Sequence, residues 1–463
     1  MRVNEYKSQI TIYNDQVKIP NKSAIFSATN MKFIRIRFFN STQRMFTTVI
    51  ILISCFLFLF SCQQNIQKDN NIIHVTLWQG INPPVNRDVF NKLVDQFNQE
   101  NSHIHVDSIF TGTPEEQLPK ILTAVVGNAA PDILNFSAQI TGQLVELGAV
   151  EPLDDWFNQS AAKSEIYPQV IEELQLDDHL WSVPLYTANL GIFYRNDLFK
   201  KAGISETPKN WQELREVAKK LTIDRNGDQR PEQYGILLPL GKQEWTVFSW
   251  FPFLLGAGGE ILNNNHPNLN NPDAIQALQF WQDLIKDGSA TLSPPERGYE
   301  EDAFIQGRVA MQITGPWTYI KNSNVDFGVF PIPENKVRAT VIGNGNFYLM
   351  KTTPEKQKAA LEFLEFVVSK QFQTEWAMGT GFLPVNIKSA QSPEYQEYLK
   401  SRPWLKVFVD QIPVAGSRPT IAGYSRISDS LGRAIEATLL GKSSPEAALK
   451  QAQERLEVIW GEK

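Results

Sequence analysis

From Ile72 onward, short runs rich in β-branched residues alternate with amphipathic segments, and this alternation restricts the possible fold more than any other feature. IIHVTLW is typical of a strand, RDVFNKLVDQFNQEN of a helix with one apolar face, and IHVDSIF of a second strand. EEQLPKILTAVVGNAAPDILNFS then predicts a helix that stops at Gly127 and a third strand entered through Pro131. The sequence therefore predicts an α/β protein with open, mainly parallel sheets flanked by helices.

Four later segments predict helices that begin at or near a proline, which suits a first helical turn because no N–H donor is needed there. They are KNWQELREVAKKL, DAIQALQFWQDLIKDG, PEKQKAALEFLEFVVSKQFQTEWA and SPEAALKQAQERLEVIW. RVAMQIT predicts a strand that ends before Pro316. Since ligands of open α/β sheets bind beyond the carboxyl ends of strands, Trp317 and Tyr319 are expected in the first turn of the next helix, facing a cleft. Packing of an ordinary strand–helix corner is the alternative for both.

The first 61 residues have the pattern of a secretory signal. VIILISCFLFLF is apolar but short for a bilayer span, and the segment from Met31 to its end carries four basic and no acidic residues. It ends in LFSC, which resembles the box of bacterial lipoproteins, in which Cys62 becomes the lipidated first residue. We predict a leader over residues 1–61, with Met31 as the possible true start, and a polar tether over 62–71. Ordinary signal-peptidase cleavage or an uncleaved anchor is the alternative.

Charge and length restrict the partners and the domain count of the remaining chain. The leader holds eight of the 44 Lys+Arg and two of the 50 Asp+Glu, which leaves 36 basic and 48 acidic residues and a net charge of −12. Such a surface repels nucleic acid and anionic lipid, so membrane attachment is expected through the lipid on Cys62 alone. With Cys55 in the leader, no disulfide is expected. The 402 residues left of 463 exceed one compact core, which predicts two lobes.

A resemblance to a known family rests on blocks spread from Ile72 to Trp460. AFIQGRVAMQITGPWTYI, VDFGVFPIPE and TVIGNGNFYLMKTTPEKQKAALEFLEFVVSKQFQTEWAMGTGFLPVN are similar to the central signature of the family 1 extracellular solute-binding proteins, the sugar-capturing components of ABC importers. GNAAPDIL, LWSVPLYTANLGIFYRNDLFKKAGI and SRPTIAGYSRISDSLGRAIEATLLGKSSPEAALKQAQ agree in order and spacing.

The resemblance implies the two-lobed, type II periplasmic-binding-protein fold, in which each lobe is a mainly parallel sheet flanked by helices and the ligand lies in the interlobe cleft. Lobe 1 is then expected over 72–187 plus 344–386, and lobe 2 over 188–343 plus 387–463. The crossings are expected near 186–190, 342–346 and 384–388. The glycines of IGNGN support the second crossing independently, because they allow unusual backbone angles and a close approach to a ligand.

A sugar pocket needs flat aromatic surfaces for the C–H faces of the ring and planar polar side chains for its hydroxyls. The residues that match the family's motifs, and are expected first as ligand contacts, are Trp317, Tyr319, Gly343, Asn344, Asn346 and Arg418. A second group lies at predicted strand ends and loops, at the first crossing, or, for Trp245, before a helix of the second lobe. It comprises Gln79, Glu115, Asn135, Ser137, Tyr186, Asn189 and Trp245.

The family likeness implies a monomeric binding protein without cofactor or catalysis, exported to the periplasm and lipid-anchored, that passes a sugar to the permease of an ABC importer. The ATPase subunits would be indirect partners. Three alternatives remain open: binding of glycerol 3-phosphate or a glycerophosphodiester, which Arg418 and Arg426 could serve; an exported carbohydrate-active enzyme; and a structural or signalling lipoprotein that has lost transport.

Motifs for catalysis and metal binding are weak. Adjacent acidic pairs such as Glu115 and Glu116 do not by themselves place carboxylates on opposite sides of a glycosidic bond. DRNGDQRPEQYG, which begins at Asp224, resembles a calcium loop, but Gln229 replaces its turn glycine and Gly235 its bidentate glutamate. We therefore predict no catalytic residue and no metal site, and we leave weak calcium binding at Asp224 open.

Overall fold

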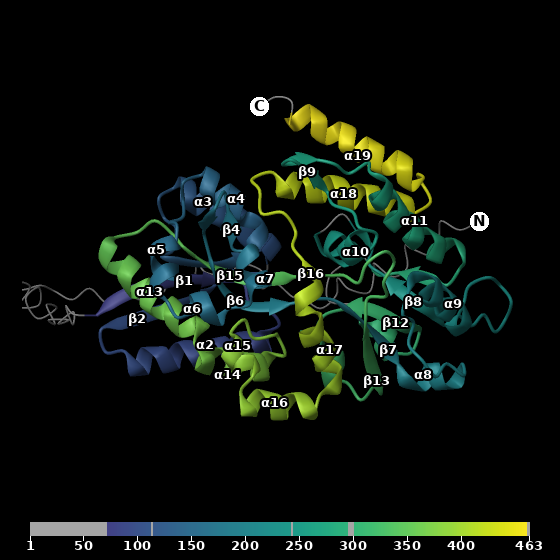
Figure 1. Ribbon diagram of the computed structural model, residues 1–463, viewed down its shortest axis with the longest axis horizontal. Helices are drawn as coiled ribbons and strands as arrows, with labels where there is room; N and C mark the ends of the chain where they lie inside the picture. The colour runs from purple at the N-terminus through teal and green to yellow at the C-terminus, as the bar shows by residue number, and fades with distance from the viewer. Residues whose placement is uncertain (1–71, 113, 242–243, 295–300, 461–463) are drawn as a thin grey trace, which may run out of the picture. The chain divides into compact units, whose positions relative to one another are not determined.

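The computed structural model describes residues 72–112, 114–241, 244–294 and 301–460 (Figure 1). The predicted leader, tether and lipidated Cys62 lie outside the described residues. Within these ranges, no helix combines the length and the apolar composition needed to cross a bilayer.

The first sheet has the strand order β2–β1–β3–β15–β6. β1 pairs in parallel with β2 and β3, whereas β15 runs antiparallel to β3 and β6 because it enters from the other lobe. The strands span Ile73–Gln79 (β1), Ile104–Phe110 (β2), Ile133–Ser137 (β3), Val183–Ala188 (β6) and Gly343–Leu349 (β15).

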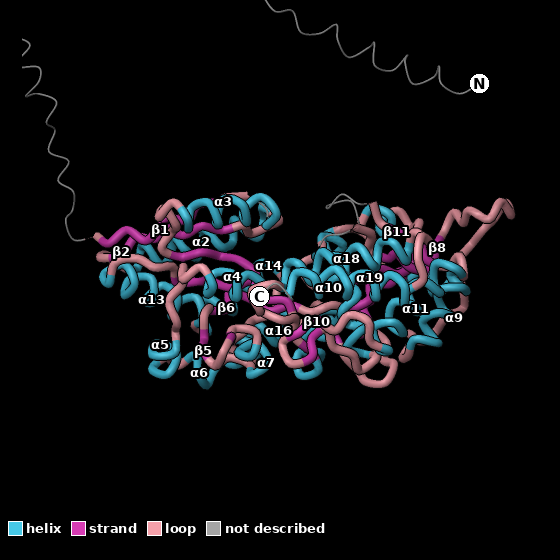
Figure 2. The backbone as a smooth tube through the Cα atoms, turned by 90° about the horizontal axis from the view of Figure 1, so that it is seen from above, coloured by secondary structure: helices cyan, strands magenta, loops and turns pink. Residues whose placement is uncertain are grey.

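Helices cover both faces of this sheet and, with it, form lobe 1. One face is buried by apolar side chains of α2, α13 and α14, such as Phe90, Phe363 and Trp376, and the other by residues of α3 and α4, such as Ile121 and Leu144. Figure 2 shows α3 and α13 on opposite sides of β1. The elements are α2 (Pro84–Glu100), α3 (Pro114–Val126), η1 (Ala138–Ile140), α4 (Thr141–Glu146), α5 (Asp154–Gln159), α6 (Ala162–Glu165), α7 (Pro168–Glu172), β4 (Gln175–Leu176), β5 (His179–Leu180), α13 (Pro354–Val368) and α14 (Lys370–Thr380).

The second sheet has the strand order β11–β8–β12–β7–β13. β11, β8 and β12 are parallel, and β7 runs antiparallel to both β12 and β13. The strands span Gly191–Arg195 (β7), Tyr234–Leu238 (β8), Ala290–Leu292 (β11), Val309–Thr314 (β12) and Phe327–Pro331 (β13).

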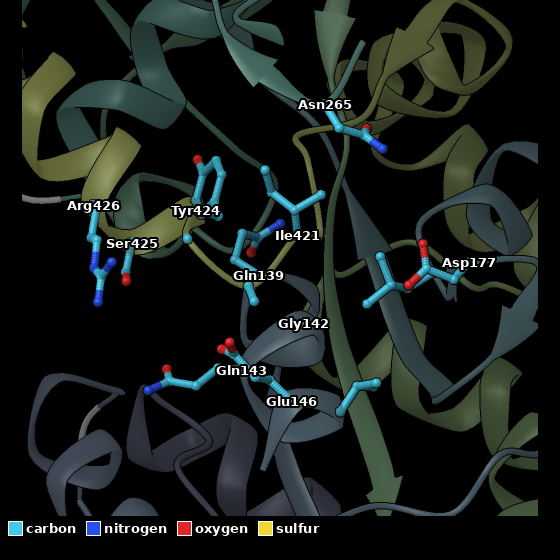
Figure 3. A pocket seen from close by; sticks show the side chains of 14 residues that line it. Gln139, Gly142, Gln143, Glu146, Asp177, Asn265, Ile421, Tyr424, Ser425 and Arg426 are labelled. Carbon is cyan, nitrogen blue, oxygen red and sulfur yellow. The ribbon is translucent and has the colours of Figure 1, made fainter. Parts of the chain in front are cut away.

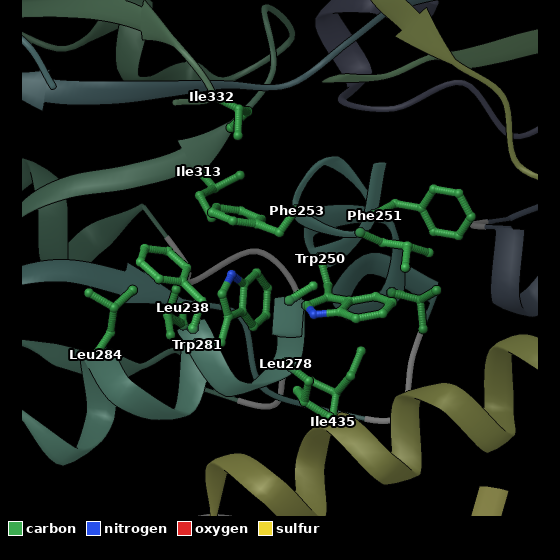
Figure 4. Close-up of a cluster of buried hydrophobic side chains, with 14 of the residues drawn as sticks. Leu238, Trp250, Phe251, Phe253, Leu278, Trp281, Leu284, Ile313, Ile332 and Ile435 are labelled. Atoms are coloured by element: carbon green, nitrogen blue, oxygen red, sulfur yellow. The ribbon is translucent and has the colours of Figure 1, made fainter. Parts of the chain in front are cut away.

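The core of lobe 2 is rich in aromatic residues, and Trp250 and Trp281 are fully buried between the sheet and α18 (Figure 4). The helices of this lobe are α8 (Asn196–Lys201), α9 (Trp211–Leu221), α10 (Glu244–Gly256), α11 (Pro272–Lys286), α12 (Asp302–Ile305), α17 (Pro403–Gln411), α18 (Tyr424–Leu439) and α19 (Pro445–Trp460). Short elements are η2 (Tyr319–Asn322), η3 (Ile412–Val414), β9 (Leu262–Asn263), β10 (His266–Pro267), β14 (Thr340–Val341) and β16 (Ala415–Gly416), and α15 (Ile387–Ala390) and α16 (Pro393–Lys400) connect α14 to α17.

Three connections join the two sheets. The chain leaves β6 through Asn189 and Leu190 to enter β7, returns through β14 into β15, and leaves α14 again through α15. The first two connections are bonded to each other, because the Thr340 hydroxyl accepts from the Leu190 amide at 3.2 Å and donates to the Leu190 carbonyl at 3.0 Å. β14 also pairs with β16, which leads the chain toward Arg418.

Two predicted helices differ in the structure. The single helix expected over PEKQKAALEFLEFVVSKQFQTEWA is two helices, because Ser369 adopts an extended backbone and its hydroxyl accepts from the Phe372 amide to begin α14. Trp317 lies in a turn instead of a helix. The Thr318 hydroxyl accepts from the Ile320 amide at 3.2 Å, so the following 3₁₀ helix begins only at Tyr319.

Candidate ligand-binding site

Trp317 stands where the two lobes meet. Its partly exposed indole packs against the buried clusters of both lobes, with ring centroids 6.2 Å from Trp245 and 6.5 Å from Phe248 in lobe 2, and 6.0 Å from Phe382, which follows α14. Gly315 permits this position, because a Cβ there would lie 2.2 Å from the indole ring. The turn after β12 thus presents a flat aromatic side chain at the lobe junction.

A second aromatic stack continues from Phe382 into lobe 1. Tyr186 lies 3.8 Å from Phe382 and 6.2 Å from Trp376, with nearly parallel rings. The neighbouring strand makes room for it at Gly345, where a Cβ would lie 2.4 Å from the Tyr186 ring. The glycine in the middle of the crossing strand therefore serves close packing of an aromatic side chain.

Arg418 and Glu244 form the charged centre of the junction. The Arg418 guanidinium donates to the Glu244 carboxylate and lies 4.4 Å above the Phe248 ring. Glu244 also accepts from the Tyr424 hydroxyl at 2.7 Å and from the Ser428 hydroxyl. The carboxylate lies in the first turn of α10, where the helix dipole favours negative charge. Burial lowers the pKa of Arg418, but Tyr424, Glu244 and Glu173 outweigh it and hold that pKa above its usual value.

Several buried polar atoms at this junction have no hydrogen-bond partner among the described residues. Both amide ends of Asn344 are unpartnered, as are Oδ1 of Asn346 and Nε of Arg418. Asn344 and Arg418 are only 4 % and 6 % exposed. Burial raises the pKa of Glu173 to about 7, and the nearby Arg418 charge only partly opposes this rise. Such atoms need hydroxyl or water partners, because each one left unmet costs about 1–3 kcal/mol.

A cavity of about 460 Å³ is lined by both lobes next to this centre. Tyr424 links the two, because it lines the cavity and binds Glu244. Figure 3 shows polar side chains of lobe 1 facing the start of α18 across this space. The polar lining residues are Gln139, Gln143, Glu146, Asp177, Asn265, Ser425 and Arg426.

The structure brings some of the predicted site residues together. Trp317 and Trp245 contact each other, and Phe248 links Trp317 to Arg418. A Cβ at Gly343 would lie 2.9 Å from Phe248 and 3.8 Å from Arg418, so the crossing strand begins beside this pair. Asn344 and Asn346 follow Gly343 along β15.

Other predicted residues are engaged in the protein itself. The Asn189 amide donates to the Phe408 carbonyl and accepts from Gln411. Asn135 donates to the Asn346 carbonyl, and the buried Gln79 accepts from the Ile81 amide.

Three further residues were predicted as ligand contacts, namely Ser137, Glu115 and Tyr319. The carbonyl of the partly exposed Ser137 accepts from the Tyr348 hydroxyl at 3.0 Å. The side chains of Glu115 and Tyr319 lie outside the described part of the chain.

Sequence reasoning did not single out five residues of this arrangement, which are Phe248, Phe382, Glu244, Tyr424 and Ser428. Glu244 and Phe248 flank the predicted Trp245, so a search of the same helical turn would have found them. Tyr424 and Ser428 lie one helical turn apart in the quoted SRPTIAGYSRISDS block.

In the candidate calcium loop, the carboxylates of Asp224 and Asp228 accept hydrogen bonds from backbone amides of the loop. Asp224 accepts from the Gly227 and Gln229 amides at 2.8 and 2.9 Å, and Asp228 accepts from the Arg230 amide. Among the described residues, no group of three or more His, Cys, Asp or Glu side chains is arranged to hold a metal ion.

Two α/β lobes joined by three crossings, with aromatic faces and polar side chains gathered at their junction, define the class of two-lobed solute-binding proteins. The chain belongs to the bacterial extracellular solute-binding protein family, whose family model matches residues 92–402.

Curated relatives and solved structures agree with this family. A binding protein of Brucella abortus is 28 % identical over 350 residues, which cover 74 % of this chain and 82 % of that protein. The sn-glycerol-3-phosphate-binding periplasmic protein UgpB of Pectobacterium atrosepticum is 22 % identical over 408 residues, or 82 % of this chain and 90 % of that protein. The crystal structure of the cyclic alpha-maltosyl-1,6-maltose binding protein from Arthrobacter globiformis superposes with a TM-score of 0.72 at 25 % identity, over 84 % of this chain and 99 % of that chain.

Proposed function

We propose that this protein is the binding component of an ABC importer, which captures a sugar outside the cytoplasmic membrane and delivers it to the permease. One observation carries the proposal: the partly exposed indole of Trp317 lies at a junction that also holds buried polar atoms of Asn344 and Arg418 without a partner among the described residues. An aromatic face suits the C–H surface of a sugar ring, and amide and guanidinium groups suit its hydroxyls. The family and the maltosyl-maltose-binding structure support the same ligand class.

Ligand capture would act through lobe closure. Aromatic and polar groups from both lobes would contact the sugar together only when the lobes are closed, so the ligand would favour the closed state by its differential affinity. The closed form would then present a distinct surface to the permease, and the separate ATPase subunits would hydrolyse ATP. The protein itself would act as a monomer, without cofactor and without catalysis.

Export and anchoring are part of the proposal. The signal pattern before Cys62 and the polar tether after it suit a lipoprotein held at the outer face of a membrane, which would concentrate the binding protein near its permease. Mass spectrometry of the membrane-associated protein should find residue 62 as the acylated N-terminus.

A second ligand class is favoured by one comparison. The UgpB relative is named for sn-glycerol 3-phosphate, and Arg418 and Arg426 are cations at the same junction. Binding of glycerol 3-phosphate or a glycerophosphodiester is therefore the second candidate function.

A thermal-shift panel followed by calorimetry tests the proposal. The panel holds glucose, maltose, trehalose, a glucosylated polyol, sn-glycerol 3-phosphate and glycerophosphocholine, and at least one sugar should raise the melting temperature and bind saturably. Product analysis of the same mixtures should find no cleaved sugar. Turnover of an oligosaccharide would favour the carbohydrate-active enzyme instead, and no binding at all would favour a lipoprotein that has lost transport.

A further inference from the structure

We infer that Glu244 makes this site select uncharged ligands, because it cancels the charge of Arg418 where a phosphate would otherwise bind. This inference rests on the proposed function and deepens it by naming the electrostatic class of the ligand. Neither Glu244 nor its neighbours on α18 were expected in the site from sequence, and their role follows from the contacts in the structure.

The guanidinium of Arg418 already has an anionic partner in the protein, so a phosphate would have to compete with that partner. The guanidinium forms an ion pair with the Glu244 carboxylate, and it stacks over the Phe248 ring. Buried Glu173 is a second carboxylate within electrostatic range of the same guanidinium. A phosphate entering here would meet a neutral or negative group of charges instead of a free cation, so Coulomb attraction is lost.

Glu244 is held in place independently of Arg418. The Tyr424 and Ser428 hydroxyls donate to its two carboxylate oxygens from the first turns of α18. The carboxylate is partly exposed, at 40 % of the side chain, whereas Arg418 is almost completely covered. An incoming ligand therefore meets negative charge at the surface of this pair. In the described part of the chain, removing the charge of Glu244 would leave Glu173 as the remaining carboxylate that raises the pKa of Arg418.

The other cations around the junction are compensated as well. Arg426 lines the cavity together with two acidic residues, Glu146 and Asp177. Lys321, beside the Trp317 turn, directs its ammonium group at the Thr380 carbonyl at the C-terminal end of α14, where a helix dipole favours a cation. In the described part of the junction, neither the cavity nor the Arg418–Glu244 pair therefore offers a phosphate an excess of positive charge.

The experiment compares each sugar with its phosphorylated form by calorimetry, using glucose and glucose 6-phosphate, trehalose and trehalose 6-phosphate, and glycerol and sn-glycerol 3-phosphate. The wild type is compared with Glu244→Gln, which keeps the size and an acceptor oxygen but removes the charge. Glu260→Gln, at an exposed loop of lobe 2, is the control with the same change in net charge.

The wild type should bind the uncharged member of its best pair at least tenfold more tightly than the phosphorylated member. Glu244→Gln should reduce the ratio of the affinity for the uncharged member to that for the phosphorylated member at least tenfold, about 1.4 kcal/mol. The affinity that the variant gains for the phosphorylated member should fall as the NaCl concentration rises. Glu260→Gln should leave the ratio unchanged. A loss of packing alone would weaken both members equally, so the ratio separates a charge effect from a structural one.

Two results would overturn the inference while leaving solute binding intact. One is tighter binding of sn-glycerol 3-phosphate or another phosphorylated member by the wild type. The other is an unchanged ratio in a folded Glu244→Gln protein. If that variant does not fold, the wild-type ratios decide by themselves. If no member of any pair and no ligand of the thermal-shift panel binds the wild type, both the proposed function and this inference are wrong.

Discussion

At the lobe junction, two aromatic rings occupy space that is open because a neighbouring residue is glycine. Gly315 and Gly345 carry no side chain, and the rings of Trp317 and Tyr186 occupy the space. Asn344 shows the opposite case, since its amide is buried and has no hydrogen-bond partner among the described residues. The glycines thus permit close aromatic packing, whereas Asn344 offers polar atoms that a bound hydroxyl could satisfy.

Replacing Trp317 by alanine should weaken binding of the preferred sugar at least tenfold, about 1.4 kcal/mol, because the stacking face is lost. Calorimetry measures the affinity, and circular dichroism checks that the fold is intact. Trp156→Ala, which removes an equally large, partly exposed side chain of α5, is the control and should keep the wild-type affinity. Equal affinity of Trp317→Ala and the wild type would contradict the assignment.

Glu173 should make stability depend on pH. Because burial raises its pKa from 4.5 to about 7 in the folded state, the folded protein binds the proton more tightly than the unfolded chain does. This contribution to the free energy of unfolding is complete below pH 4.5, is lost as pH rises to about 7, and totals at most about 3 kcal/mol. Glu173→Gln lacks it, so the variant should gain stability relative to the wild type between pH 5 and pH 8 in urea denaturation. Parallel pH profiles would count against a buried, proton-binding Glu173.

At the scale of elements, caps decide where helices begin and therefore which side chains face the junction. Ser369 ends α13 in an extended conformation and caps α14, so that both helices pack on the same sheet. Thr318 delays the 3₁₀ helix to Tyr319 and leaves Trp317 in a turn. Without these two breaks, continuous helices would carry Trp376 and Trp317 to other positions.

Ser369→Ala should lower the free energy of unfolding by about 1 kcal/mol, the usual cost of losing a helix N-cap. The reason is that the Phe372 amide then loses its partner at 3.2 Å. Urea denaturation measures the effect, and Ser205→Ala, in an exposed loop, is the control expected to match the wild type. A cost below a few tenths of a kcal/mol would mean that water replaces the cap.

At the scale of the whole molecule, the segment that runs from Arg418 to Tyr424 ties the lobes together. The Gly142 amide donates to the Thr420 carbonyl at 2.9 Å, and the Thr420 hydroxyl donates to the Gln175 carbonyl. The same segment carries Arg418 to Glu244 in lobe 2. The segment therefore bonds to lobe 1 through Thr420 and to lobe 2 through Arg418.

Gly142→Ala should hinder this approach, because a Cβ there would lie 2.1 Å from the backbone nitrogen of Ala422 in the opposite lobe. We expect sugar affinity to fall at least tenfold and the ligand-induced compaction seen by small-angle X-ray scattering to be lost. Gly127→Ala, at the exposed end of α3, is the control in the same lobe. Normal affinity and compaction in Gly142→Ala would mean that the two backbones separate without cost.

Local patterns were enough to predict much of the architecture. The strands at Ile73 and Ile104, the helix that contains Phe90 and the helices after Pro208 and Pro272 lie where periodicity placed them, because burial of one face imposes that periodicity on the sequence itself. The family was also predicted, from blocks that resemble it, and with the family the two-lobed fold.

The meeting of distant side chains was decided by the tertiary structure alone. Glu244 and Arg418 are separated by 174 positions, and neither residue's local sequence encodes the other's place. Asn189, a predicted ligand contact, instead bonds to residues more than 200 positions away. Hydrophobic periodicity reports which face of an element is buried, whereas a polar contact depends on how whole elements are positioned against each other, which only the packed chain determines.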